Sequence, residues 1–271
     1  MKHIALAIAL CASPAFASPV PGELPAGVAG ADVLFIGEIH DNPHHHVRQA
    51  ELTAAAAPAA LVFEMLTPEQ ARAATPELMG DADALGAALG WAETGWPDFS
   101  MYAPIFAAAP DARVYGAAIP REAARAAMGE GVVAWFGAGE ATRFGLDAPL
   151  AEAEQARREA VQLAAHCDAL PGEMLPVMVE IQRLRDAALA RAAAAALAET
   201  GGPIVVITGN GHARLDEGAP VYLARALPDA TIRSYGQAED GRLDGRFDAT
   251  GDSPAVERDD PCAAFAARPT E

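Results

Sequence analysis

Two short segments of this chain place a histidine three residues after a glycine, Gly37–His40 and Gly209–His212. Glu38 lies inside the first segment, and Glu64 follows a separate apolar run. Imidazoles and carboxylates transfer protons near neutral pH and bind divalent metals. The set therefore predicts proton-transfer or metal chemistry, provided that the fold brings these residues together.

Each of these residues comes just after a run of apolar β-forming residues. The runs are continuous rather than alternating, which is typical of strands that are covered on both faces of a parallel sheet. Ligands of such sheets bind beyond the carboxyl ends of the strands. The expected strands are 33–36, 60–63, 112–119 and 204–207, with a last one near 231–235.

The segments between these strands read mainly as helices. Asn42 and Pro43 are typical of a helix N-cap and first position, which predicts a helix to about residue 57. Two helical stretches, about 67–109 and about 122–200, are much longer than ordinary connections, so we expect them to form a helical cap. The predicted fold is α/β, with a mostly parallel sheet flanked by helices and this cap inserted between strands. We expect residues 18–271 to form a single domain.

Two assignments of the polar residues stay open. His44 would lie in the first turn of the helix, close enough to join a metal site. Consecutive helical residues point different ways, so His44, His45 and His46 cannot all face that site. Asp41 could orient an imidazole. A catalytic set would comprise Glu38, His40, Glu64 and His212, and a set of metal ligands would comprise His40, His44, Glu64 and His212.

The first residues read as a cleavable export signal. Lys2 and His3 precede an apolar stretch, and Ala15–Ala17 forms a small-x-small cleavage site, so the signal peptide spans 1–17 and the mature chain begins at Ser18. We expect cleavage without lipidation, because Leu10 precedes Cys11 where a small residue would be needed. No later segment has the roughly 20 apolar residues of a membrane helix.

Charge and cysteine content narrow the possibilities further. The net charge of −18 argues against nucleic acid as a partner. Cleavage leaves Cys167 and Cys262 in a compartment that permits disulfides, so the pair forms either one bridge or two buried thiols.

Five motifs together resemble the ChaN family of haem-binding, iron-regulated bacterial proteins. The resemblance extends over about residues 31–237. It rests on the motifs 37–45 (GEIHDNPHH), 63–65 (FEM), 120–121 (PR), 182–186 (QxxRD) and 209–214 (GNGHAR). The family belongs to a wider group with the Tiki, TraB and erythromycin esterase-like proteins, some of which are hydrolases, and Tiki is described as a metal-dependent protease.

The resemblance implies an exported, periplasmic protein that binds haem, with two stacked haems at a homodimer interface in one described member. A tyrosine holds each iron there. In this chain a tyrosine or a histidine would supply the ligand, and Tyr102 is the best tyrosine candidate, since residues 122–200 contain no tyrosine. Arg121 or Arg185 would bind the haem propionates, because a guanidinium matches a carboxylate with two hydrogen bonds.

Two functions are therefore expected. The first is a haem-binding protein of the ChaN type, acting in haem and iron acquisition or storage. The alternative is a metal-dependent hydrolase that uses the paired Gly-x-x-His motifs and a divalent metal ion to activate water.

Overall fold

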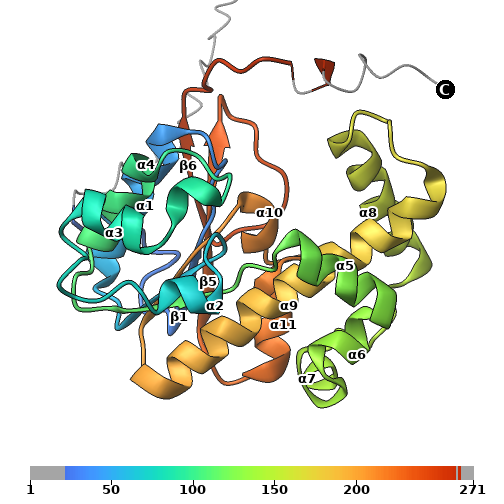
Figure 1. Ribbon diagram of the computed structural model, residues 1–271, viewed down its shortest axis with the longest axis horizontal. Helices are drawn as coiled ribbons and strands as arrows, with labels where there is room; N and C mark the ends of the chain where they lie inside the picture. The colour runs from blue at the N-terminus through green and yellow to red at the C-terminus, as the bar shows by residue number, and fades with distance from the viewer. Residues whose placement is uncertain (1–21, 261, 264–271) are drawn as a thin grey trace, which may run out of the picture.

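Six parallel strands form the centre of the molecule. The computed structural model describes residues 22–260 and 262–263, so the predicted signal peptide, 1–17, lies outside the described residues. The strand order is β3-β2-β4-β1-β5-β6, and every pairing is parallel, which confirms the predicted α/β class (Figure 1). The strands are β1 (Val33–Ile36), β2 (Ala60–Phe63), β3 (Arg113–Gly116), β4 (Ile204–Ile207), β5 (Ile232–Glu239) and β6 (Ala249–Ser253).

The three strands β2, β4 and β1 are neighbours at the centre of the sheet, and all of their residues are buried. Their register is exact, with Ile36 of β1 and Phe63 of β2 both paired with Ile207 of β4. The three strands therefore end at one level, and the loops that follow them start side by side.

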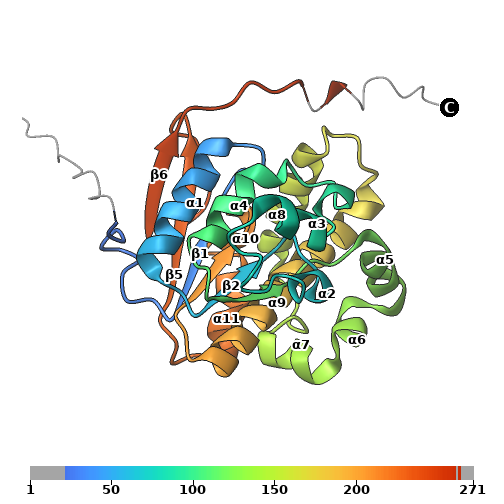
Figure 2. The same ribbon diagram turned by 60° about the vertical axis from the view of Figure 1, so that its left-hand side comes forward.

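Side chains alternate between the two faces of these strands, so each face has its own core. Leu34, Ile36, Leu61 and Phe63 point toward one set of helices, and Val33, Phe35 and Val62 point toward another. The first face is covered by α1 (Pro43–Ala56), α2 (Pro68–Ala71), α3 (Ala82–Ala88), the 3-10 turn η1 (Trp91–Glu93) and α4 (Phe99–Ala107). Figure 2 shows α4 next to α1 on this face.

The opposite face is covered by the long helix α9 (Leu175–Thr200) and by α11 (Ala219–Ala226). Outside α9 lie three short helices, α5 (Arg121–Glu130), α6 (Val132–Phe136) and α7 (Ala138–Phe144). Helix α8 (Glu152–Ala165) packs against α9, and the 3-10 turn η2 (Gly172–Met174) lies between α8 and α9 in the chain. The two predicted cap segments thus have different places: α2–α4 and α9 pack over the sheet itself, whereas α8 contributes no buried residue.

The start of α1 follows the sequence prediction closely. Asn42 is the N-cap, and its Oδ1 accepts a hydrogen bond from the backbone N–H of His44 at 2.9 Å, with Pro43 at the first helical position. This cap fixes the direction of the chain at the end of the loop 37–42, which follows β1 and which we call the site loop.

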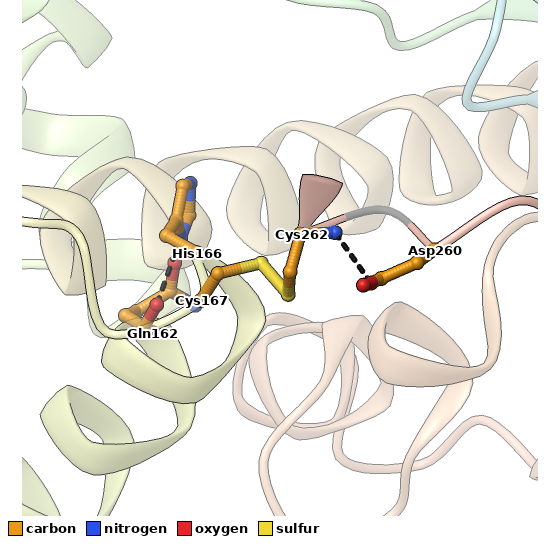
Figure 3. Close-up of a disulfide and its surroundings, with 5 residues drawn as sticks. All are labelled: Gln162, His166, Cys167, Asp260 and Cys262. Carbon is orange, nitrogen blue, oxygen red and sulfur yellow. Dashed lines mark hydrogen bonds between the residues drawn. A yellow bond between two sulfur atoms is a disulfide. The ribbon is translucent and has the colours of Figure 1, made fainter. Parts of the chain in front are cut away.

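The C-terminal region adds a strand beyond the five that the sequence predicts. Strand β5 extends to Glu239, and residues 249–253 add β6 in parallel beside it. Beyond β6 the chain reaches Cys262, which is bonded to Cys167 in the turn after α8 (Figure 3), so the predicted bridge forms. Among the described residues, no helix is long and apolar enough to cross a membrane.

Candidate functional site

Polar residues follow the three central strands directly, and the strand order brings them together. Glu38 and His40 follow β1, Glu64 follows β2, and His212 lies in the short helix α10 (Asn210–Ala213) after β4. The chain leaves β1 toward β2 and leaves β4 toward β5, so the crevice between β1 and β4 is a topological switch point. The four residues of the predicted catalytic set therefore meet at one edge of the sheet.

The two glycines of the Gly-x-x-His motifs allow the loops to approach closely. A Cβ on Gly37 would lie 3.1 Å from the Cα of Asn210, and a Cβ on Gly209 would lie 3.0 Å from His40 Nε2. Each glycine thus leaves room for the loop that carries the other motif.

Glu38 is a buried carboxylate that orients His40. Its Oε1 is 2.7 Å from His40 Nδ1 and accepts a hydrogen bond from the hydroxyl of Tyr102 at 2.9 Å. With Nδ1–H directed at Glu38, the other ring nitrogen of His40, Nε2, is the one available to a ligand. The His40 side chain is 33% exposed and its ring is 4.8 Å from the ring of Trp96.

A second imidazole, His46, lies behind this pair and is buried. Its Nε2 donates to the carbonyl of His40 at 2.8 Å, and its Nδ1 lies 3.1 Å from Gln49 Oε1 and 3.2 Å from Glu38 Oε2. Among the described residues, Glu38 Oε2 has no hydrogen-bond donor.

On the other side of the crevice, His212 is held between two carboxylates. Its Nδ1 is 2.7 Å from Oδ1 of Asp186, which lies on α9, and its Nε2 is 3.6 Å from Glu64 Oε1. The second oxygen of Glu64 accepts hydrogen bonds from Thr208 Oγ1 at 2.6 Å and from the backbone N–H of Gly209 at 2.8 Å.

These contacts decide the charges of the groups. Burial alone would lower the pKa of His212, but Glu64 and Asp186 outweigh it and raise the pKa to about 9. For Glu64, burial raises the pKa, yet His212, His40 and the Thr208 hydrogen bond lower it to about 2. Burial lowers the pKa of His40, but the hydrogen bond to Glu38 and the charge of Glu64 reverse this and raise the pKa above 6.5. His212 and Glu64 are therefore an ion pair at neutral pH.

A cleft of about 660 Å³ opens over these residues. Its volume falls within the range of about 300–1,000 Å³ that is usual for small-molecule sites. Apolar walls come from Trp96, Val161 of α8 and Val179 of α9, and Arg185 of α9 also lines the cleft. A smaller chamber of about 150 Å³ adjoins it and shares Glu64, Trp96 and Arg185. Among the described residues, Arg185 makes no salt bridge, whereas Arg158 at the rim pairs with Glu154 at 2.7 Å.

Three predicted residues lie elsewhere. His44 is exposed and lines a separate groove with Arg48 on α1, so it does not join His40 and His212. Arg121 is exposed at the start of α5 and does not line the cleft. Tyr102 is fully buried in the core with its hydroxyl on Glu38, so it supports the site from below and does not line the cleft.

The divalent metal ion finds no support in this geometry. Among residues 22–260 and 262–263, no group of three or more His, Cys, Asp or Glu side chains is placed to hold a metal ion. The ion pair between His212 and Glu64 accounts for part of this, because each occupies an atom that a metal would need.

Other residues of the site were not assigned from the sequence. The main omission is the role of Asp186, which holds Nδ1 of His212. Asp41, predicted to orient an imidazole, instead binds Arg258 at 2.6 and 2.7 Å. A signal for Asp186 was present, since it is the last residue of the motif at 182–186 that carries part of the family resemblance.

Comparison with known proteins gives one family. Residues 24–223 match the model of the family described as haem-binding uptake, Tiki superfamily, ChaN. No match was found among curated proteins.

Among solved structures, the chain is similar to one described as cofacial heme binding to ChaN of Campylobacter jejuni. The identity is 18% and the TM-score 0.58, over 79% of this chain and 84% of that chain, which indicates a shared fold. A more distant likeness is the type III effector HopBA1, with 14% identity and a TM-score of 0.41 over 82% of this chain and 88% of that chain. Another is a Bacillus cereus protein, with 15% identity and a TM-score of 0.36 over 87% of this chain and 73% of that chain.

Proposed function

Because the chain belongs to the haem-binding uptake family ChaN of the Tiki superfamily, we propose that it binds haem in the cleft over β1, β2 and β4. The observation that carries this proposal is the coincidence of a family match over residues 24–223 with a cleft that combines apolar walls, an accessible imidazole and a cation.

The residues of the cleft fit a haem group. His40 supplies the iron ligand: Glu38 holds its Nδ1, Nε2 has no hydrogen-bond partner among the described residues, and the missing Cβ of Gly209 leaves that nitrogen uncovered. A carboxylate behind the ring strengthens an imidazole ligand. His212 is the weaker candidate, because its Nε2 faces Glu64 and its pKa of about 9 keeps it protonated.

The propionates and the macrocycle are assigned to the walls of the cleft. Arg185 binds a propionate, since it lies at the junction of the cleft and the smaller chamber without a carboxylate partner among the described residues. Trp96, Val161 and Val179 supply apolar contact to the ring. Of the two arginines predicted from the sequence, the geometry favours Arg185 over Arg121, which is exposed on α5.

The first experiment is a haemin titration of the disulfide-bonded protein, followed by Soret absorbance. We expect saturable binding at micromolar concentration. The His40→Ala variant should bind at least about tenfold more weakly, equivalent to about 1.4 kcal/mol, with a changed spectrum. His44→Ala is the matched control, because it removes an imidazole four residues away that lines a different groove. Absence of saturable binding by the unsubstituted protein would overturn the proposal.

A second titration tests the propionate assignment. Arg185→Gln should weaken the binding of haemin but not of its dimethyl ester, which carries no carboxylate, and Arg121→Gln should change neither. Equal weakening of both ligands would show that Arg185 acts through the fold and not through a propionate.

We further propose that the protein works in the periplasm, in haem and iron acquisition or storage. The Cys167–Cys262 bridge supports an oxidising compartment, as does the apolar leader with its cleavage site. Cell fractionation with mass measurement of the mature chain tests this: the expected species begins at Ser18 and is extracytoplasmic, and an uncleaved cytoplasmic chain would contradict the assignment.

A further inference from the structure

One wall of the cleft belongs to a helical hairpin that has little core of its own. We call residues 151–178 the hairpin; they comprise α8, the turn after it, η2 and the first residues of α9, and none of their side chains is buried. The cleft-lining residues of α8 are Arg158, Val161 and Gln162. A segment without buried apolar side chains depends on other contacts for its position.

Ion pairs contribute only part of the contacts that hold the hairpin in place. Arg157 and Arg158 of α8 pair with Glu217, which precedes α11, and the Arg158 contact is 3.6 Å. Partly exposed pairs of this kind contribute modestly and weaken with salt. Among the described residues, these ion pairs therefore hold the hairpin only modestly to the segment before α11.

The C-terminal segment supplies the missing attachment. We call residues 254–260 and 262 the strap. It starts beside the site loop, where Asn42 Nδ2 donates to the carbonyl of Pro254 at 3.1 Å. Farther along, Arg258 binds both Asp41 and Glu239 through four hydrogen bonds of 2.6–2.7 Å.

The disulfide joins this strap to the turn of the hairpin. Figure 1 shows the strap leaving β6 and running toward the outer end of α8, and Figure 3 shows Cys262 bonded to Cys167 just after that helix. Asp41 directly follows His40, so the strap is anchored to one wall of the cleft by Arg258 and to the opposite wall by a covalent bond. It thereby sets how far the walls can separate.

We propose that the Cys167–Cys262 bond is a redox-sensitive clasp that keeps the hairpin closed over the ligand in the cleft. The identity of the ligand rests on the proposed haem-binding function, whereas the closure of the hairpin by the disulfide does not. In the disulfide form the hairpin retains haem, and in the dithiol form it opens and haem leaves faster. Both cysteines are half-buried near the outer end of the hairpin, where a reductant has access.

The chemical step is ordinary thiol–disulfide exchange with a dithiol reductant, either a small molecule or a protein. One reductant thiolate attacks Cys167 or Cys262, the S–S bond breaks, and a mixed disulfide forms. The second reductant thiol then displaces the protein sulfur, so the reductant is oxidised by two electrons to its disulfide. Both protein sulfurs end as thiols, with their protons taken from the two reductant thiols.

Hydrogen–deuterium exchange without ligand tests the structural part. The variant Cys167→Ser with Cys262→Ser should exchange faster over residues 151–178, while β1, β2 and β4 stay protected. The matched control is Ala164→Ser with Ala263→Ser, which introduces the same hydroxyls at exposed positions near each cysteine and keeps the bond. The clasp would be overturned if exchange in the variant became faster throughout the sheet, or if it did not become faster in the hairpin.

Haemin release tests the functional part. Each protein is loaded with haemin and mixed with excess apo-globin, and transfer is followed in the visible spectrum. The cysteine variants avoid thiol reductants, which would themselves react with haem iron. Coupling between two sites usually changes an affinity by about 5–150-fold, and affinity differences between related complexes lie mostly in the dissociation rate. We therefore expect release from the double serine variant to be faster by about this factor, and release from the control to be unchanged. Equal release rates would refute the clasp.

The two tests separate the clasp from the function beneath it. If no form binds haemin but the hairpin alone loses protection in the variant, the proposed ligand is wrong and the clasp stands. If haemin binds and the hairpin remains protected without the bond, the function stands and the clasp is wrong.

Discussion

The strongest electrostatic prediction concerns His212, which lies between Asp186 and Glu64. Its side chain is 14% exposed, and its pKa is raised to about 9 from the ordinary 6.5 because the two carboxylates outweigh the effect of burial. The folded state thus binds this proton more tightly than the unfolded chain does. The stabilisation is complete below pH 6.5 and is lost as the pH rises through about 9.

The magnitude follows from the two pKa values. The difference between 6.5 and about 9 corresponds to about 3 kcal/mol, at about 1.4 kcal/mol per pH unit. Glu64 does not titrate in this window, because its pKa is about 2. The loss with rising pH is therefore assigned to deprotonation of the imidazole.

The assay is urea unfolding of the wild type and of His212→Asn at about pH 6 and about pH 10. Asparagine keeps a donor for Asp186 but carries no charge. We expect the variant to be less stable by about 3 kcal/mol at the lower pH and to approach the wild type at the higher pH. A difference in the free energy of unfolding that stays constant between the two pH values would refute the assigned cation.

Three further substitutions test the site from other directions. Tyr102→Phe should lower the free energy of unfolding by about 1.5–3 kcal/mol, because it removes a hydrogen bond to buried Glu38. The haemin spectrum should stay the same, and a lost Soret band would show that this tyrosine reaches the iron. Gly209→Ala should weaken haemin binding with little change in the urea midpoint, because the new Cβ would lie 3.0 Å from His40 Nε2; unaltered affinity would exclude that nitrogen as the ligand. Asn42→Ala should cost at least about 1–2 kcal/mol in urea unfolding, because it removes the cap of α1 together with the bonds that Asn42 Nδ2 donates to Glu239 and Pro254; a neutral result would mean that neither the cap nor these bonds stabilise the fold.

The parts of the fold that the sequence predicts are those with a local cause. The apolar runs form β1, β2 and β4 because strands buried on both faces need continuous apolar residues. Asn42 and Pro43 start α1 because the cap and the fixed backbone angle act within one turn. The meeting of Glu38, His40, Glu64 and His212 could be expected from the rule that parallel strands bind ligands at their carboxyl ends.

The parts that were missed depend on long-range contacts. Strand β6 has the polar sequence Ala249–Ser253, and it is a strand only because β5 offers it backbone partners. Asp186 reaches His212 from a 26-residue helix, and the side of that helix facing the site depends on how it packs against the sheet. From the sequence, Tyr102 is favoured as an iron ligand because residues 122–200 contain no tyrosine, but the packing of the helices buries it completely, with the Trp91 ring 4.7 Å away.

The two Gly-x-x-His motifs look equivalent in sequence, and their surroundings make them chemically different. Each imidazole has a carboxylate on Nδ1, at 2.7 Å in both cases, so each ring is held in one orientation. The difference lies at the other nitrogen. Glu64 faces Nε2 of His212 and fixes a positive charge there, whereas Gly209 leaves Nε2 of His40 open to the cleft. A charged imidazole cannot donate a lone pair to iron, so the contact with Glu64 favours an electrostatic role for His212 and leaves His40 as the better candidate for the proposed ligand.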